Sequence, residues 1–149
     1  LQDLLADGPV AITFARGHWC PYCRIAVSAL AEIADEAKAA GGQIVAIVPD
    51  RQEYSAKLKA EASAPFPILT DIDNGYAMSL NLAIWIGAEM QKMLEGRQDL
   101  PTFQGNNSWI LPIPATFVVG GDGRVRARFI DPDYRKRTGI ADMLAAMRS

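Results

Sequence analysis

Two short apolar segments in the first third of the chain flank a longer segment with helical periodicity. Val10–Phe14 and Gln43–Val48 are rich in β-branched side chains, which predicts two buried strands. Cys20–Ala40 between them carries apolar residues four positions apart and predicts a helix. The rows expected to face the core are Ile25, Ala29, Ile33 and Ala37, and beside them Ala26, Leu30 and Ala34. A strand, a helix and a strand in this order favour a parallel strand pair with a right-handed crossover.

The rest of the chain alternates turn residues with shorter patterns. Asp50 and Glu53 have the spacing of a capping box, which predicts a helix over Arg51–Ala62. The other predicted elements are an edge strand at Phe66–Leu69, a short helix ending near Leu80, a strand at Pro112–Val119, a hairpin turn at Gly120–Gly123, a return strand at Val125–Ile130 and a closing helix at Thr138–Met147.

The order of these elements predicts an α/β, thioredoxin-like fold, in which helices flank a central mixed sheet. A parallel half would be followed by an antiparallel hairpin and a terminal helix. Asn81–Leu111 would form an insertion before the strand that contains Pro114, with one helix around Met90 and Met93. The length of 149 residues predicts a single domain over 1–149. The tryptophans of the insertion are expected to pack in the core.

Composition narrows the possible functions. The net charge is −2, and acids flank the basic cluster near Arg137, which argues against a nucleic-acid partner. No apolar run reaches the roughly 18 residues that cross a bilayer, so no membrane partner is expected. The chain begins at Leu1 without an initiator Met, and we expect its true N-terminus to lie upstream. We expect the protein to be located in the cytoplasm and to be either a monomer or a homodimer.

Cys20 and Cys23 form a C-x-x-C pair where the first strand gives way to the helix. A helix N-terminus carries partial positive charge and free N–H donors, which stabilise a thiolate and lower the pKa of its thiol. We expect Cys20, at the helix cap, to be the more exposed cysteine and the nucleophile. Cys23, one turn further, would be partly covered and would resolve a mixed disulfide.

Other uses of this pair are less favoured. A structural disulfide across three residues closes a very small loop and stabilises little. Zinc needs four ligands, and only the two cysteines and His18 are at hand, so we expect no metal and no cofactor. His18 is either a cation that lowers the pKa of Cys20 or an exposed loop residue. Trp19 is either a substrate-contacting surface or a packing residue.

Pro114 is the second functional candidate. Only X-Pro bonds adopt the cis form with appreciable frequency, and the sequence does not reveal the isomer. A cis-proline here would place the backbone of Ile113 opposite Cys20, where it could hydrogen-bond to a bound substrate chain. An ordinary trans proline at a strand edge is the alternative.

Three segments together resemble the peroxiredoxin-like branch of the redoxin superfamily, the alkyl hydroperoxide reductase/thiol-specific antioxidant proteins. They are Ala15–Arg24, Leu111–Val119 and Asp131–Tyr134. The resemblance covers nearly the whole chain and implies a thioredoxin fold with antioxidant or oxidoreductase activity. In thioredoxins the matching positions are the C-x-x-C pair and the cis-proline.

The peroxiredoxin motif Pro-x-x-x-Thr-x-x-Cys fits this chain only at its last position. It would make Cys23 the peroxidatic cysteine, with Cys20 at the Thr position and Arg16 at the Pro position. Pro114 stands roughly where peroxiredoxins hold an activating arginine. The acid on the first strand of thioredoxins is also replaced, by Thr13 or a neighbour.

Three functions therefore remain open. The first is thiol–disulfide exchange, in which Cys20 attacks, Cys23 resolves, and Trp19, Ile113 and Pro114 contact a disulfide-containing protein. The second is a thiol peroxidase, in which one cysteine reacts with a hydroperoxide and a thiol reductant such as a thioredoxin system restores the pair. The third is a redox-inert binding module or a redox sensor.

Overall fold

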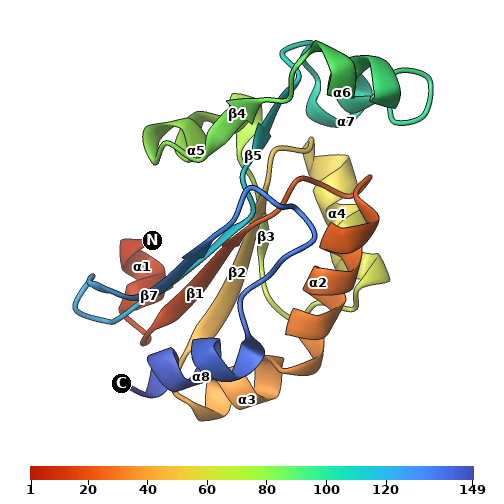
Figure 1. Cartoon of the computed structure of the whole chain (residues 1–149). Coiled ribbons are helices and arrows are strands. Elements are labelled where there is room, and N and C mark those ends of the chain that lie inside the picture. The colour runs from red at the N-terminus through yellow and green to blue at the C-terminus, as the bar shows by residue number, and fades with distance from the viewer.

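A five-stranded mixed sheet forms the centre of the protein (Figure 1), described here for all residues 1–149 from a computed structural model. Its strands, in spatial order, are β3 (Ile68–Thr70), β2 (Gln43–Val48), β1 (Val10–Phe14), β6 (Ala115–Val119) and β7 (Val125–Ile130). The first three are parallel to one another, β6 is antiparallel to β1, and β7 is antiparallel to β6. The predicted thioredoxin-like α/β fold is confirmed.

Helices cover both faces of the sheet (Figure 1). They are α1 (Gln2–Leu5), α2 (Pro21–Glu32), α3 (Ala34–Ala39), α4 (Gln52–Glu61), α5 (Gly75–Ser79) and α8 (Ile140–Arg148). Side chains alternate along β2: Ile44 and Val48 pack with residues of α2, α3, α4 and α8, whereas Val45 and Ile47 pack with residues of α1 and α5. Both faces of the sheet are therefore buried, as expected for a parallel core.

The helix predicted from Cys20 to Ala40 is divided at Ile33, whose backbone leaves the helical region and separates α2 from α3. The predicted buried face is also wrong at its start, because Ile25 is 68% exposed. Cys23 and Val27 face the core there, together with Leu30, which was predicted to do so. Their i, i+4, i+7 spacing turns the helix so that the second cysteine of the pair points inward.

The segment between β3 and β6, which includes the insertion predicted at Asn81–Leu111, contains two short strands and a second helix that the sequence did not predict. It comprises the 3₁₀ turn η1 (Ile72–Asn74), α5, β4 (Ala83–Trp85), α6 (Ala88–Leu94), α7 (Leu100–Gln104) and β5 (Ile110–Pro112). β4 and β5 pair antiparallel as a separate ribbon beyond the end of the main sheet (Figure 1). Of the two tryptophans in the insertion that were expected to pack in the core, Trp109 is buried, whereas Trp85 is 60% exposed. The strand predicted at Pro112–Val119 is split, because Ile113 and Pro114 link the ribbon to β6.

One predicted cap is not formed. Arg51, not Asp50, occupies the N-cap of α4, and no side chain caps that helix. The side chain of Asp50 turns into the protein instead and is completely buried. The predicted edge strand, hairpin and closing helix are present with small shifts of their ends. No helix in the structure combines the length and apolar character that crossing a membrane requires.

Candidate active site

The two cysteines lie at the start of α2, directly beyond the carboxyl end of β1. Cys20 is the N-cap, Pro21 follows at the first helical position, and the N–H of Cys23 donates to the carbonyl of Cys20 at 3.1 Å. Both thiols are reduced, and both residues are buried, with exposed fractions of 1% for Cys20 and 0% for Cys23. The expectation of an exposed Cys20 is therefore wrong, because Cys20 packs in the buried core cluster that also contains Trp19 and Cys23.

The two thiols differ in their acidity. A hydrogen bond between the two side chains lowers the pKa of Cys20 to about 6, and it outweighs the opposing effect of burial. The N–H of Cys23 and the charges of Arg16 and Arg137 lower this pKa further. The same side-chain hydrogen bond, together with burial, raises the pKa of Cys23. At neutral pH Cys20 is thus the thiolate and Cys23 the thiol that donates to it.

Two arginines distant in sequence contact the second sulfur. The backbone N–H of Arg16 lies 3.3 Å from Sγ of Cys23, and Nη2 of Arg137 lies 3.5 Å from the same atom. Arg137 is anchored through Nη1, which donates to the carbonyls of Tyr134 and Lys136. Its Nε is buried without a partner. The sulfur of Cys23 therefore lies against one guanidinium and one backbone N–H.

The guanidinium of Arg16 lies between two aromatic rings. Its central carbon is 4.8 Å from the ring centroid of Trp19 and 4.3 Å from that of Tyr134. Nε1 of Trp19 donates to the carbonyl of Arg16 at 3.2 Å, and the tryptophan is 8% exposed. Trp19 is thus a packing residue that fixes Arg16, and it offers little surface for a substrate.

Asp50 is the functional candidate that the sequence analysis missed. It follows β2, its exposed fraction is 0%, and its Oδ2 accepts the backbone N–H of His18 at 2.6 Å. Burial raises its pKa to about 6, the hydrogen bond and the charge of His18 oppose the rise, and the charge of Cys20 adds to it. The capping-box spacing with Glu53 concealed this inward orientation.

His18 contributes to the site through its backbone. Its ring Nε2 lies 3.0 Å from Oε2 of Glu61 on α4, and the ring packs beside Phe103 at a centroid distance of 6.2 Å. The side chain is 15% exposed, so it is not the solvent-exposed loop residue that was one of the two expectations. The contact with Glu61 holds the ring against α4, and the backbone N–H of His18 binds the loop to Asp50.

Sequence comparison decides the family. The AhpC/TSA family matches residues 1–128, most of the chain. The chain belongs to the AhpC/TSA family. It is therefore a peroxiredoxin-like, thiol-dependent redox enzyme. No protein of curated function matches the sequence.

Solved structures of peroxiredoxins share the fold of this AhpC/TSA chain. Peroxidoxin BcpB from Mycobacterium tuberculosis aligns with a TM-score of 0.73 and 20% identity, over 99% of this chain and 82% of that one. A reduced peroxiredoxin from Vibrio vulnificus in complex with hydrogen peroxide gives 0.74 and 16%, over 98% and 83%. The bacterioferritin comigratory protein of Xanthomonas campestris, described for alkyl peroxide reduction, gives 0.71 and 17%, over 96% and 80%.

Pro114, whose isomer the sequence left open, is trans in this AhpC/TSA chain, which contains no cis peptide bond. The N–H of Ile113 donates to the carbonyl of Leu82 at 2.6 Å, and the carbonyl of Pro114 accepts the N–H of Asp131 at 3.3 Å. Ile113 and Pro114 therefore join the β4–β5 ribbon to the main sheet. The N–H expected to bind a substrate chain is already occupied.

The proton acceptor that thioredoxins carry on their first strand has no equivalent on β1. Thr13 is buried, and its hydroxyl lies 3.1 Å from that of Thr116 on β6. Asp50, at the end of the neighbouring strand, is the buried acid of this site. No cluster of His, Cys, Asp or Glu side chains is arranged to hold a metal ion.

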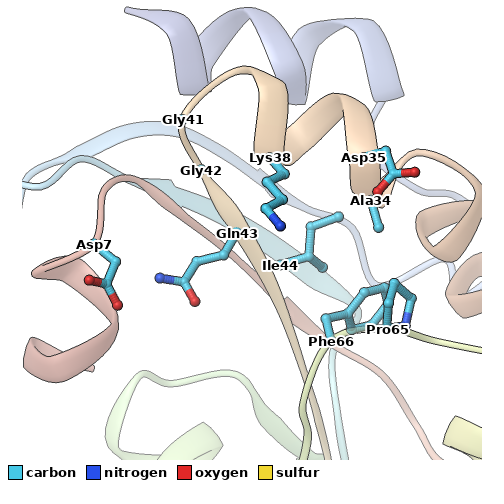
Figure 2. Close-up of a pocket in the computed structure, with 10 residues that line it drawn as sticks. All are labelled: Asp7, Ala34, Asp35, Lys38, Gly41, Gly42, Gln43, Ile44, Pro65 and Phe66. Carbon is cyan, nitrogen blue, oxygen red and sulfur yellow. The ribbon is translucent and has the colours of Figure 1, made fainter.

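Two hollows lie at different distances from the thiols. A mostly apolar groove of about 230 Å³ runs along α2, where Tyr22 and Ile25 face Arg137 and Ile140. A cavity of about 500 Å³ lies near the start of β2, between α1 and α3 (Figure 2). The larger cavity is thus at the end of the sheet opposite to the cysteines and takes no part in this site.

Proposed function

We propose that this AhpC/TSA protein reduces hydroperoxides with the Cys20–Cys23 dithiol. The observation that carries the proposal is the reduced thiol pair at the N-terminus of α2, with Arg137 3.5 Å from one sulfur and a pKa of about 6 at the other. A thiolate at neutral pH is the nucleophile that attacks a peroxide oxygen. Positive charge beside it stabilises the negative charge that develops on the departing oxygen.

The reaction has two oxidising steps. The thiolate of Cys20 attacks the terminal peroxide oxygen, the O–O bond breaks, and Cys20 becomes a sulfenic acid while an alcohol or water leaves. Cys23 then attacks the sulfenic sulfur, releases water and forms the disulfide. An external thiol reductant, such as a thioredoxin system, supplies the two electrons that restore the dithiol.

A second assignment of the two sulfurs is supported by a different observation. The peroxiredoxin motif register places the peroxidatic cysteine at Cys23, and it is Sγ of Cys23 that Arg137 and the N–H of Arg16 contact. We favour Cys20 because the hydrogen bond between the thiols makes it the more acidic of the two.

Thiol–disulfide exchange with a protein substrate has less support. A substrate chain could be held by a free backbone edge opposite the nucleophile, but the N–H of Ile113 is bonded to the carbonyl of Leu82. Both sulfurs are also buried, so a small hydroperoxide reaches them more readily than a folded protein does.

The test is stopped-flow oxidation of the reduced protein by hydrogen peroxide and by a small organic hydroperoxide, followed by tryptophan fluorescence. We expect rates far above that of free cysteine in the wild type. We expect Cys20→Ser to abolish the fast phase, and Cys23→Ser to retain it but stop at a trappable sulfenic acid on Cys20, located by mass spectrometry. Fast oxidation of Cys23 in Cys20→Ser would support the other assignment. A wild-type rate equal to that of free cysteine would contradict peroxidase function.

A further inference from the structure

Asp50 is a buried carboxyl group that the two steps above do not use. One of its oxygens, Oδ2, accepts the N–H of His18, whereas the other, Oδ1, is buried and has no hydrogen-bond partner. A buried carboxylate oxygen without a partner costs free energy, and a proton on that oxygen removes the cost. The environment of Asp50 therefore favours a carboxylic acid whose proton can be transferred.

The loop before Cys20 is built to accommodate this carboxyl group. A Cβ atom at Gly17 would lie 2.5 Å from Oδ1 and 2.8 Å from Oδ2, closer than real contacts allow. Gly17 also has a φ of +133°, a conformation that side-chain-bearing residues rarely adopt. Only glycine lets the backbone pass this close, so the carboxyl group lies against the loop three residues before the nucleophile.

Two charged groups near Asp50 act on its pKa in opposite directions: the charge of His18 lowers it, and that of Cys20 raises it. On the loop, the His18 ring is paired with Glu61 of α4. At the start of α4, the half-exposed guanidinium of Arg51 is paired with Glu53. On the α7 side, the N–H of Arg51 bonds to the carbonyl of Phe103, an apolar residue. The negative charge of Cys20 raises the pKa of Asp50, so the two groups compete for one negative charge.

We propose that Asp50 is the proton donor for peroxide reduction at Cys20, an inference that rests on the proposed function. The Cys20 thiolate forms an S–O bond, the O–O bond breaks, and the departing alkoxide or hydroxide takes the proton of Asp50, either directly or through one water. Condensation with the Cys23 thiol then releases one water. One thiolate, one thiol, one carboxylic acid and one hydroperoxide thus yield a disulfide, an alcohol, water and the Asp50 carboxylate.

Asp50→Asn tests the inference, because its carbonyl oxygen can still accept the N–H of His18 but cannot donate a carboxyl proton. The wild type needs ionised Cys20 and protonated Asp50, so its rate of oxidation by hydrogen peroxide should rise and then fall with pH around 6. We expect the variant to lose the falling limb and to react at least about tenfold more slowly at pH 6. Iodoacetamide alkylation should meanwhile show the pKa of Cys20 lowered, because a negative neighbour is gone.

A matched control is Asp71→Asn. Asp71 also follows a strand and accepts backbone N–H groups, those of Tyr76 and Ala77, but on α5. It should match the wild type in rate and pH profile. An Asp50→Asn variant that keeps the wild-type rate and profile would overturn the inference alone. The inference would also be overturned if the rate of Asp50→Asn fell only in proportion to a smaller thiolate fraction of Cys20. Such a fall would show that the substitution changes the ionisation of Cys20 and not a proton transfer from Asp50. A wild type no faster than free cysteine would instead overturn the proposed function, and the inference with it.

The wild type provides a readout that needs no variant. Oxidation to the Cys20–Cys23 disulfide removes the thiolate whose charge raises the pKa of Asp50. Carbon-13 NMR of protein labelled at aspartate carboxyl groups should therefore show one carboxyl titrating near pH 6 in the reduced protein and at lower pH in the oxidised protein. A titration that is the same in both states would contradict the coupling on which the inference depends.

Discussion

Ionisable side chains lie at both ends of the central sheet, but they are buried at one end and exposed to water at the other. At the carboxyl ends of β1 and β2, Cys20, Cys23 and Asp50 are buried, and Arg16 and Arg137 contact the sulfur of Cys23. At the opposite end lies the cavity of about 500 Å³ in which Asp7, Asp35 and Lys38 are exposed (Figure 2). The closed end holds Cys20, Cys23 and Asp50, whose pKa values are shifted in part by burial, whereas the charged groups that line the cavity are exposed to water.

This difference shows that burial and partner choice, not cavity size, create reactivity in this fold. Water screens charges in an open cavity, so an aspartate and a lysine there interact weakly. In the closed end, each charge is felt by its neighbours, and the Cys20 thiolate, Asp50 and the arginines form one coupled system. Three experiments test how far this contrast extends.

The largest effect is expected for the pH dependence of stability. Asp50 has a pKa of about 6 in the folded protein and 3.8 as a model group, so the folded state keeps its proton to higher pH. Its contribution favours folding below pH 3.8 and is lost as the pH rises through 6. Between pH 4 and 7, the free energy of unfolding of the reduced wild type should fall by up to about 3 kcal/mol relative to that of Asp50→Asn. Urea unfolding measures this difference. In the control variant Asp35→Asn, which changes an exposed residue, the free energy of unfolding should follow the wild type over the same pH range. A difference as large as that of Asp50→Asn would show that the two ends of the sheet do not differ in this respect.

A somewhat smaller effect is expected for the arginine above the thiols. Arg137→Ala removes a cation that lowers the pKa of both cysteines and that faces the developing charge. We expect the peroxide reaction to slow about a hundredfold, or about 2.7 kcal/mol, with the pKa of Cys20 raised. The matched variant Lys38→Ala, at the open end, should react like the wild type. Similar losses in both variants would show that the two ends are not functionally distinct.

The smallest effect concerns the hydrogen bond between the thiols. Cys23→Ala removes the donor that lowers the pKa of Cys20 to about 6, so this pKa should rise toward 9. The alkylation rate of Cys20 by iodoacetamide at pH 7 should then fall about tenfold as the thiolate fraction drops. Cys23→Ser keeps a hydroxyl donor and should fall less. Equal rates in the wild type and the alanine variant would assign the low pKa of Cys20 to the backbone N–H of residue 23 and to the charges of Arg16 and Arg137.

Local sequence patterns predicted the central fold well. Val10–Phe14, Gln43–Val48 and the Gly120–Gly123 hairpin were recognisable because a buried strand or a tight turn depends on neighbouring residues. The β4–β5 ribbon was not, because Ala83–Trp85 and Ile110–Pro112 are three residues each and pair only through long-range contacts. The break at Ile33 was missed because the pattern of apolar residues continues across it, so the sequence indicates one uninterrupted helix.

The site was only partly predictable. The C-x-x-C spacing located both cysteines, but exposure of Cys20 depends on a loop that the sequence did not orient. Arg137 lies 114 residues from the sulfur that it contacts, and no local pattern links the two. Asp50 fits a capping box equally well whether its side chain caps α4 or turns inward. The isomer of Pro114 depends on the ribbon that precedes it.

The close approach of Gly17 to Asp50 also restricts how this protein can evolve. Any larger residue at position 17 collides with the carboxyl oxygens and requires a strained backbone, so it is disfavoured for as long as Asp50 is retained. Loss of the carboxyl group removes only the collision, because the φ of +133° still disfavours a side chain. The order of substitution is therefore fixed. Position 50 changes first, and among descendants of this sequence an aspartate at 50 should almost always be found with a glycine at 17.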